Sequence, residues 1–238
     1  MKLSLKRNRE QIESLTNRFR KLFLSEDERK QFDARVRKNA FVAVFDEKRW
    51  GDQPSGGGST PEDTRGARDI VAKVIHDFKI QSMVDLPCGD FAWMPLVLKN
   101  LPDTFRYMGG DIVPSLIAKH RQEYPQYQFE TLDFVKDPIP PADLIFTRDA
   151  LQHLPLPDIH AALANFSKSG CKYLLTTTHL RRYGFRNGRN IRVGRCRDRN
   201  LLLAPFNLTD PLVIYSEQHP GHKFLGLWEL PLKYVRRS

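Results

Sequence analysis

The sequence of 238 residues has little cysteine and no long apolar run. Its three cysteines, Cys88, Cys171 and Cys196, are too widely spaced for a zinc-type cluster or a redox CxxC pair, and they fit a reducing compartment. No apolar run reaches the roughly 18 residues of a transmembrane helix, so we expect no membrane span. The opening MKLSLKRNRE lacks the apolar core of a signal peptide, which favours a cytoplasmic location.

Acidic residues are also in deficit. The chain has 28 Asp and Glu against 38 Lys and Arg, which gives a net charge of +10 and a pI near 9.6. This balance favours polyanions or acidic substrates as partners, although a basic solubilising surface explains it equally well. The length suits one sizeable α/β domain with an accessory segment, and 40% hydrophobic residues suffice for its core.

The stretch 82–111 organises the rest of the chain. It reads as a buried strand over 83–86, a tight turn, a helix over 92–100 and a second strand over 105–109 that ends in an acid. Parallel strands need a crossover of this kind, so the stretch predicts a βαβ unit. In open parallel sheets the ligand lies beyond the carboxyl ends of the strands. Four polar or flexible residues fall at such ends: Asp85, Gly89, Asp90 and Asp111.

These four residues indicate a particular kind of ligand. Asp111 can accept two hydrogen bonds from ribose hydroxyls, and Gly89 lets the backbone approach a ligand closely. The turn lacks the G-x-G-x-x-G of dinucleotide folds, and its carboxylates would repel a pyrophosphate. Carboxylates suit a ligand with hydroxyls and a positive centre. S-adenosylmethionine has an ammonium, a sulfonium and a ribose.

The run Asp85-Leu86-Pro87-Cys88-Gly89-Asp90 resembles the first motif of the class I S-adenosylmethionine-dependent methyltransferases, and Asp111 resembles the acid that follows it. The run departs from the family pattern at Pro87, where glycine is usual, and at Phe91, where Gly or Asn is common. The resemblance extends, more weakly, over about residues 50–230. The alternative is a Rossmann-like sheet that binds another nucleotide.

A Gly-rich stretch, WGDQPSGGGST, precedes this unit at residues 50–60. Its composition alone indicates a linker. Its pattern of Trp50-Gly51, Ser55-Gly56 and Gly58-Ser59-Thr60 looks like the N-terminal signature of a poorly characterised methyltransferase group. That resemblance favours a lid that wraps a ligand, with the linker as the alternative.

The resemblance implies an α/β fold: a seven-stranded, mostly parallel Rossmann-like sheet with helices on both faces. We expect this methyltransferase domain over residues 50–238, after an N-terminal helical accessory segment over 1–49. That segment contains an amphipathic helix from Ile12 to Phe23 and a second helix that starts at a capping box, Ser25 with Glu28. Thr60 with Pro61 predicts a further helix start.

Later segments fit the same sheet. Helices are expected over 114–124 and 158–167, and strands over 127–132, 142–147, 171–177, 212–216 and 224–230. Asp133 and Phe134 follow the third strand. In the resembled family an acid there often meets the adenine amino group, and Phe134 could stack on the base. A turn or helix-cap role is the equal alternative for Asp133.

The resemblance implies S-adenosylmethionine as the cofactor. The residues expected to bind it are Trp50, Ser55, Gly56, Asp85, Pro87, Cys88, Gly89, Asp90, Trp93, Asp111, Ile112, Asp133, Phe134 and Arg148.

The segment after the fourth strand contains the candidate catalytic residues. Asp149 and His153 are spaced i, i+4, so on a helix they would share a face. A carboxylate beside an imidazole orients it and raises its basicity. Our hypothesis is that His153, oriented by Asp149, is the general base for a hydroxyl acceptor. A buried structural histidine is the alternative, and His179 is the second candidate base.

Motifs that the sequence lacks argue against some classes of methyl acceptor. No Asp/Asn-Pro-Pro-Tyr/Phe run follows the fourth strand, which disfavours exocyclic amines, and no Pro-Cys pair follows it, which disfavours cytosine C5. No His/Cys/Asp cluster has metal spacing, so no metal site is expected. O-methylation of a small-molecule or glycan hydroxyl fits best. The alternatives are an RNA or protein methyltransferase that uses the Arg-rich stretch 181–199, and a non-catalytic S-adenosylmethionine-binding protein.

Overall fold

A computed structural model describes residues 20–51, 55–180, 185–217 and 222–235. Most of the first predicted helix lies outside these ranges. Contacts divide the chain between Arg37 and Lys38, inside helix α2 (Glu26–Asp46). The capping box that starts α2 is confirmed, since the Ser25 N–H donates to the Glu28 carboxylate at 2.8 Å and the Glu28 N–H donates to Ser25 Oγ at 3.4 Å. The domain boundary at 49/50 stays a prediction.

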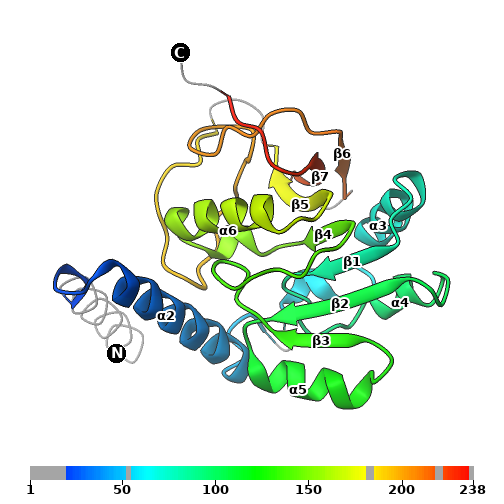
Figure 1. The fold of residues 1–238 in the computed structure, drawn as a ribbon, viewed down its shortest axis with the longest axis horizontal. Helices are drawn as coiled ribbons and strands as arrows, with labels where there is room; N and C mark the ends of the chain where they lie inside the picture. Colours follow the sequence, from blue (N-terminus) through cyan, green and yellow to red (C-terminus); the bar gives the residue numbers. More distant parts are fainter. Residues whose placement is uncertain (1–19, 52–54, 181–184, 218–221, 236–238) are drawn as a thin grey trace. The chain divides into compact units, whose positions relative to one another are not determined.

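One seven-stranded sheet forms the centre of the domain, in the order β3-β2-β1-β4-β5-β7-β6 (Figure 1). The strands are β1 (Ser82–Asp85), β2 (Arg106–Asp111), β3 (Gln128–Thr131), β4 (Leu144–Thr147), β5 (Tyr173–His179), β6 (Val213–Ser216) and β7 (Lys223–Glu229). The first five run parallel, and β7 runs antiparallel to both of its neighbours. The predicted mostly parallel sheet is therefore confirmed. Its order reverses between β1 and β4, which is where ligands bind in such sheets.

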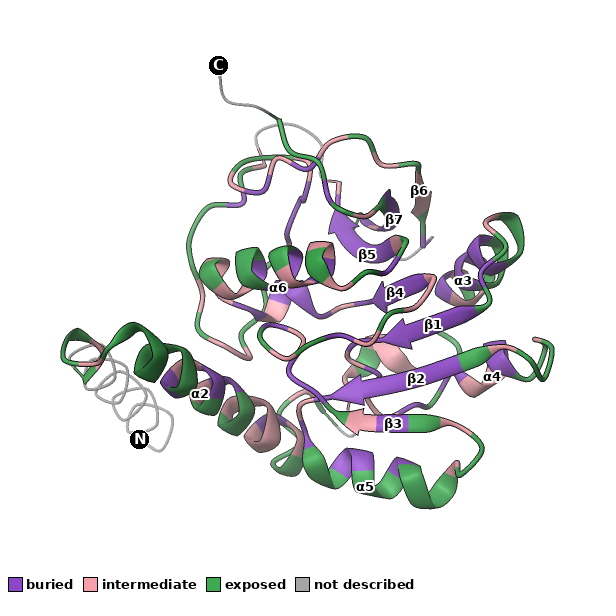
Figure 2. Ribbon diagram, viewed as in Figure 1, coloured by how far each residue is buried: buried purple, intermediate pink, exposed green. Residues whose placement is uncertain are grey.

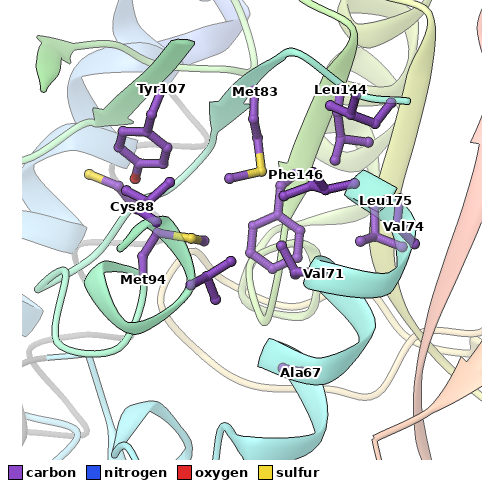
Figure 3. Close-up of a cluster of buried hydrophobic side chains, with 14 of the residues drawn as sticks. Ala67, Val71, Val74, Met83, Cys88, Met94, Tyr107, Leu144, Phe146 and Leu175 are labelled. Carbon is purple, nitrogen blue, oxygen red and sulfur yellow. The ribbon is translucent and has the colours of Figure 1, made fainter. Parts of the chain in front are cut away.

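Helices cover both faces of this sheet. They are α3 (Arg65–Asp77), α4 (Pro95–Leu98), α5 (Pro114–Glu123) and α6 (Leu156–Lys168), with 3-10 turns η1 (Gly57–Ser59) and η2 (Leu151–His153). Successive residues of β4 alternate between two apolar clusters. Leu144 and Phe146 pack with α3 and α4 (Figure 3), and Ile145 packs with α6. The central strands β1 and β4 are accordingly buried on both sides, while α5 and α6 keep exposed outer faces (Figure 2).

The helix predicted over 92–100 is reduced to the four residues of α4. Phe91, just before it, has a φ of +58°, in the left-handed region that favours glycine or asparagine. Its ring is 1% exposed and lies edge-on to the rings of Tyr124 and Phe129, at centroid distances of 4.8 and 5.1 Å. Burial of this aromatic ring holds the backbone in a turn, so the helix starts late.

The helix predicted to begin at Thr60 begins at Arg65 instead. Thr60 Oγ1 accepts the Asp63 N–H at 3.1 Å, which caps one separate turn before α3. The second residue of α3, Gly66, lies against the chain after β6. A Cβ there would stand 2.4 Å from the carbonyl oxygen of Glu217, so glycine is what allows this close approach.

Candidate active site

Two carboxyl groups lie at the carboxyl ends of β1 and β2. Asp111 Oδ2 accepts the Gly89 N–H at 3.2 Å, and its Oδ1 accepts the Val113 N–H at 3.0 Å. The predicted meeting of Asp111 with the Gly89 turn is thus present. Asp85 lies deeper, where its Oδ2 accepts the Tyr107 hydroxyl at 2.8 Å.

Burial perturbs both acids. It raises the pKa of Asp85 to about 8, although the Tyr107 hydrogen bond opposes the rise. It raises the pKa of Asp111 to about 6, against the backbone N–H groups of Val113, Gly89 and Ile112, which stabilise the carboxylate. A cation bound beside either group would favour its ionised form. The end of these two strands is therefore suited to a positively charged ligand.

The turn between β1 and α4 is held from several sides. The Cys88 N–H donates to the Gly110 carbonyl at 2.9 Å, and burial raises the pKa of the Cys88 thiol well above its usual value, so this thiol is no nucleophile. Gly89 has a φ of +56°, and a Cβ on it would lie 2.6 Å from Ser55 Oγ. Glycine is needed here both for conformation and for space.

His120 on α5 also holds this turn. Its ring is 1% exposed, and Nε2 lies 2.7 Å from the Gly89 carbonyl oxygen. A carbonyl only accepts, so Nε2 carries the hydrogen. His120 thereby fixes the orientation of the Gly89 peptide from beneath.

The Gly-rich stretch packs on the site. Ser55 Oγ accepts the Asp90 N–H at 2.8 Å, and the Gly58 carbonyl accepts a hydrogen bond from Arg148 Nη1 at 3.0 Å. Gly56 lies against Trp50, since a Cβ on it would be 3.6 Å from the Trp50 Cβ. A free linker would make no such contacts, so the described part of this stretch is packed on the chain, while its role as a lid stays a prediction.

Four charged side chains form a buried cluster at the ends of β4, β6 and β7. Arg148 Nη2 lies 2.8 Å from Glu217 Oε2, and its Nη1 lies 3.2 Å from Asp149 Oδ2. Lys223 Nζ lies 2.7 Å from Asp149 Oδ2 and 3.4 Å from Glu217 Oε2. The two positive charges of this cluster are therefore neutralised by its two negative charges. Because the Arg148 guanidinium is engaged in this cluster, its expected role in cofactor binding stays a prediction.

The expected helical pairing of Asp149 with His153 is wrong. Asp149 has a φ of +53°, and the helical turn that follows, η2, is only three residues long. The Asp149 carboxylate instead accepts Gln152 Nε2 at 3.0 Å and Lys223 Nζ at 2.7 Å. Burial would raise the pKa of Asp149, but Arg148 and Lys223 bring it down to about 2. The Asp149 carboxylate, which the sequence predicted to orient His153, therefore forms ion pairs with Arg148 and Lys223 instead.

His153 is held by other contacts. Its Nδ1 lies 3.2 Å from the Arg195 carbonyl oxygen, and its ring packs on Trp50 with centroids 4.5 Å apart. Because a carbonyl only accepts, Nδ1 carries the hydrogen and Nε2 carries the lone pair. Burial lowers the pKa of His153, with Asp149 opposing, so the ring is neutral near pH 7. A neutral imidazole with a basic Nε2 can act as a general base.

His179, the second candidate base, ends β5 and is 5% exposed. Its Nδ1 lies 3.2 Å from the backbone N and O of Arg199, and its Nε2 lies 3.6 Å from Asp198 Oδ1. Burial lowers its pKa. Both of its nitrogens face groups of the chain, so His153 is the better candidate.

The remaining predicted positions have more ordinary surroundings. Asp133 Oδ1 accepts the Val135 N–H at 3.2 Å, the turn role that was its alternative. The Phe134 ring stacks on Phe166 at 5.8 Å, and Trp93 lies in the first apolar cluster with Arg148 5.8 Å from its ring. The other positions expected to bind the cofactor at this edge are half-buried: Pro87, Gly89, Asp90 and Ile112.

Two curated relatives share part of this sequence. Both are named trans-aconitate 2-methyltransferase: one from Methylobacterium nodulans is 35% identical over 95 residues, and one from Variovorax paradoxus is 33% identical over 112 residues. These matches cover 40% and 43% of the chain, but only 36% and 42% of the relatives. The chain thus spans well under half the length of the relatives it matches. No protein-family model matches it.

Solved structures decide the fold. The 1,6-didemethyltoxoflavin-N1-methyltransferase of Burkholderia thailandensis, with S-adenosylhomocysteine bound, superposes with a TM-score of 0.58 at 15% identity, covering 87% of the chain and 91% of that protein. The N-methyltransferase NodS of Bradyrhizobium japonicum, also with S-adenosylhomocysteine, gives 0.57 at 13% identity, covering 81% and 99%. The chain has the class I methyltransferase fold. Human N-acetylserotonin methyltransferase, in complex with S-adenosylmethionine, gives 0.54 at 19% identity, covering 71% and 52%.

Several residues of this class I methyltransferase fold were not foreseen. Tyr107, His120, Glu217 and Lys223 each touch a predicted site residue from 22 or more positions away in sequence. No local pattern identifies them, because their partners become neighbours only when the strands pair. For Tyr107 and His120, the sequence carries one signal, a polar side chain among the apolar residues of a predicted strand or helix.

The Arg-rich stretch lies next to His153, the candidate base. The Gly194 N–H donates to the His153 carbonyl at 2.9 Å. Asn187 donates from Nδ2 to the carbonyls of Asn200, Leu203 and Ala204. Asn190 Oδ1 accepts the Leu156 N–H at 2.7 Å. These amides hold the backbone of the stretch in place. The first four residues of the stretch, 181–184, lie outside the described residues.

Among the residues that the structure describes, no helix is both long and apolar enough to cross a membrane. No group of three or more His, Cys, Asp or Glu within the described ranges is arranged to hold a metal ion.

Proposed function

We propose that the protein is an S-adenosylmethionine-dependent methyltransferase that methylates an oxygen of a small molecule or glycan. The observation that carries the proposal is the pairing of Asp111, at the end of β2, with the Gly89 turn after β1, next to the point where the strand order reverses. Solved proteins of this fold that superpose on the chain contain S-adenosylmethionine or S-adenosylhomocysteine. Ribose hydroxyls would meet the second lone pairs of the Asp111 oxygens.

The cofactor supplies an activated methyl group, so the protein mainly aligns donor and acceptor. A hydroxyl acceptor also has to lose a proton. His153 Nε2 is the group proposed to take it, since Nδ1 is engaged with the Arg195 carbonyl and Trp50 fixes the ring. The half-buried Trp50 ring and the Gly-rich stretch 55–60 would cover the reacting atoms and exclude water from them.

A carboxylate oxygen is the second candidate acceptor. The two relatives are named for trans-aconitate, a carboxylic acid, and the stretch beside His153 is rich in arginine. A carboxylate is ionised at neutral pH and needs no base. The role of His153 therefore separates the two acceptor types.

Cofactor binding is the first test. Titration with S-adenosylhomocysteine should release heat and raise the melting temperature of the wild type. Asp111→Ala should weaken binding about tenfold or more, because hydrogen bonds to a charged group are lost. The matched control is His153→Ala, which should keep the wild-type affinity. If the nucleoside gives neither heat nor thermal shift with the wild type, the proposed function is wrong.

The second test measures turnover. With a hydroxyl acceptor identified by mass spectrometry, using a deuterated-methyl cofactor, His153→Ala should lower kcat by at least about a hundredfold. His76→Ala, which removes an exposed histidine on α3, is the comparison and should lose far less. Unchanged turnover in His153→Ala would remove His153 as the base, whereas a deuterated methyl found on a carboxylate oxygen would favour the second candidate acceptor.

A further inference from the structure

Arg199 is buried in an unusual way. The residue is 1% exposed, and only its Nη1 is engaged, donating to the Asn187 carbonyl at 2.8 Å. Within the part of the chain that the structure describes, its buried Nε and Nη2 have no hydrogen-bond partner. A buried donor without a partner is costly, and more so when it carries charge.

No carboxylate among the described residues forms an ion pair with this guanidinium. Burial lowers the pKa of Arg199, and the positive charge of Arg197 lowers it further. The surrounding stretch is strongly basic, with six arginines and a single aspartate over residues 185–199. The charge of Arg199 thus lacks an anion that the described fold could provide.

The shape of the unpartnered edge identifies the missing partner. Nε–H and Nη2–H point in parallel from one side of the planar guanidinium, which matches two oxygens of a carboxylate or phosphate. The edge is also held in place, because Asn187, which receives Nη1, is itself 0% exposed and bonded to three carbonyls.

The location connects this edge to the candidate active site. The His179 N–H donates to the Arg199 carbonyl at 2.8 Å, so Arg199 adjoins the last residue of β5. The preceding residues 194 and 195 contact His153. Because Nε and Nη2 have no exposed surface, a ligand has to displace neighbouring side chains to reach them, which favours a small anion over the backbone of an RNA.

We propose that Arg199 is an oxyanion-binding residue that receives the carboxylate or phosphate of an anionic small-molecule methyl acceptor. The identification of that anion as the acceptor rests on the proposed function. The anion site itself does not, and it can be tested without any methyl transfer.

The experiment measures thermal unfolding in citrate, inorganic phosphate and sodium chloride at equal ionic strength, with S-adenosylhomocysteine in a separate series. The wild type should gain thermal stability with citrate, phosphate or both beyond the effect of sodium chloride. Because these anions also stabilise proteins by exclusion from the surface, the gain has to exceed that of Arg199→Met in the same salt. A response to citrate alone identifies a carboxylate site, and a response to phosphate alone identifies a phosphate site. Equal melting temperatures in all three salts would overturn the proposal.

Arg199→Met separates a binding site from a merely buried charge. This variant should melt no lower than the wild type without the anion, since an apolar side chain relieves the uncompensated charge. Its apparent Kd for the stabilising anion should rise about tenfold or more. Arg197→Met removes the same charge from an exposed neighbour and should keep the anion response. An undiminished response in Arg199→Met would also overturn the proposal.

Two further comparisons keep the outcome interpretable. Arg199→Lys keeps the charge but lacks the paired N–H edge, so it should lose most of the anion response even if Arg199→Met fails to fold. The shift caused by S-adenosylhomocysteine should persist in both variants. If the wild type responds to the anion but not to the nucleoside, the cofactor proposal fails while the anion site stands.

Discussion

Arg148→Met should destabilise the protein by about 3–5 kcal/mol, the usual cost of removing one partner from a buried ion pair. The Arg148 and Glu217 side chains are 4% and 1% exposed. Without the guanidinium, Lys223 alone would face two buried carboxylates, and the Gly58 carbonyl would lose its donor. Urea unfolding followed by circular dichroism measures the loss.

The double variant Arg148→Met/Glu217→Gln is the matched control for this prediction. It restores the charge balance of the cluster, so it should recover a large part of the stability lost in the single variant. Arg106→Met, at an exposed position on β2, should change stability by no more than about 0.5 kcal/mol. Additive effects of the two cluster substitutions would show that charge balance is not what holds this region together.

Asp85→Asn should abolish a loss of stability that the wild type shows as pH rises from about 4 to about 8. Folded Asp85 has a pKa of about 8, whereas an unfolded aspartate has one near 4. Between these values the folded state binds the extra proton, so its stability falls by up to about 1.4 kcal/mol per pH unit. Asparagine cannot ionise, and it can still accept the Tyr107 hydroxyl.

Urea midpoints of both proteins, measured from pH 5 to pH 9, test this dependence. The wild-type curve should descend towards the Asp85→Asn curve or cross it as pH rises. Asp111, with a pKa of about 6, leaves a smaller descent in both proteins at the acidic end, and this cancels in the difference. Parallel curves over the whole range would mean that Asp85 is not protonated in the folded protein.

The sheet was predictable because each of its signals is local. A buried strand such as 144–147 reads as a continuous apolar run, and turn residues such as Gly89 mark where strands end. Because the carboxyl ends of parallel strands lie at one edge of a sheet, the sequence predicts that Asp111 and Gly89 lie close together. The structure confirms that meeting.

The candidate base site was less predictable because its partners come from distant strands. Asp149 pairs with Lys223, 74 positions away, and Arg148 pairs with Glu217, 69 positions away. These ion pairs hold Asp149 in a left-handed conformation, which ends the expected helix before His153 can share a face with it. The spacing of Asp149 and His153 in the sequence cannot show that Asp149 will pair with Lys223 instead, because Lys223 becomes its neighbour only when the strands pair.

Of the three thiols, Cys88 and Cys171 are buried and Cys196 is exposed. Cys196 immediately follows Arg195, whose carbonyl contacts the candidate base. A maleimide dye would therefore attach to the native protein at one position, next to the residue that contacts the candidate base, without any engineered cysteine. The natural sequence already supplies a fluorescent reporter site for ligand occupancy.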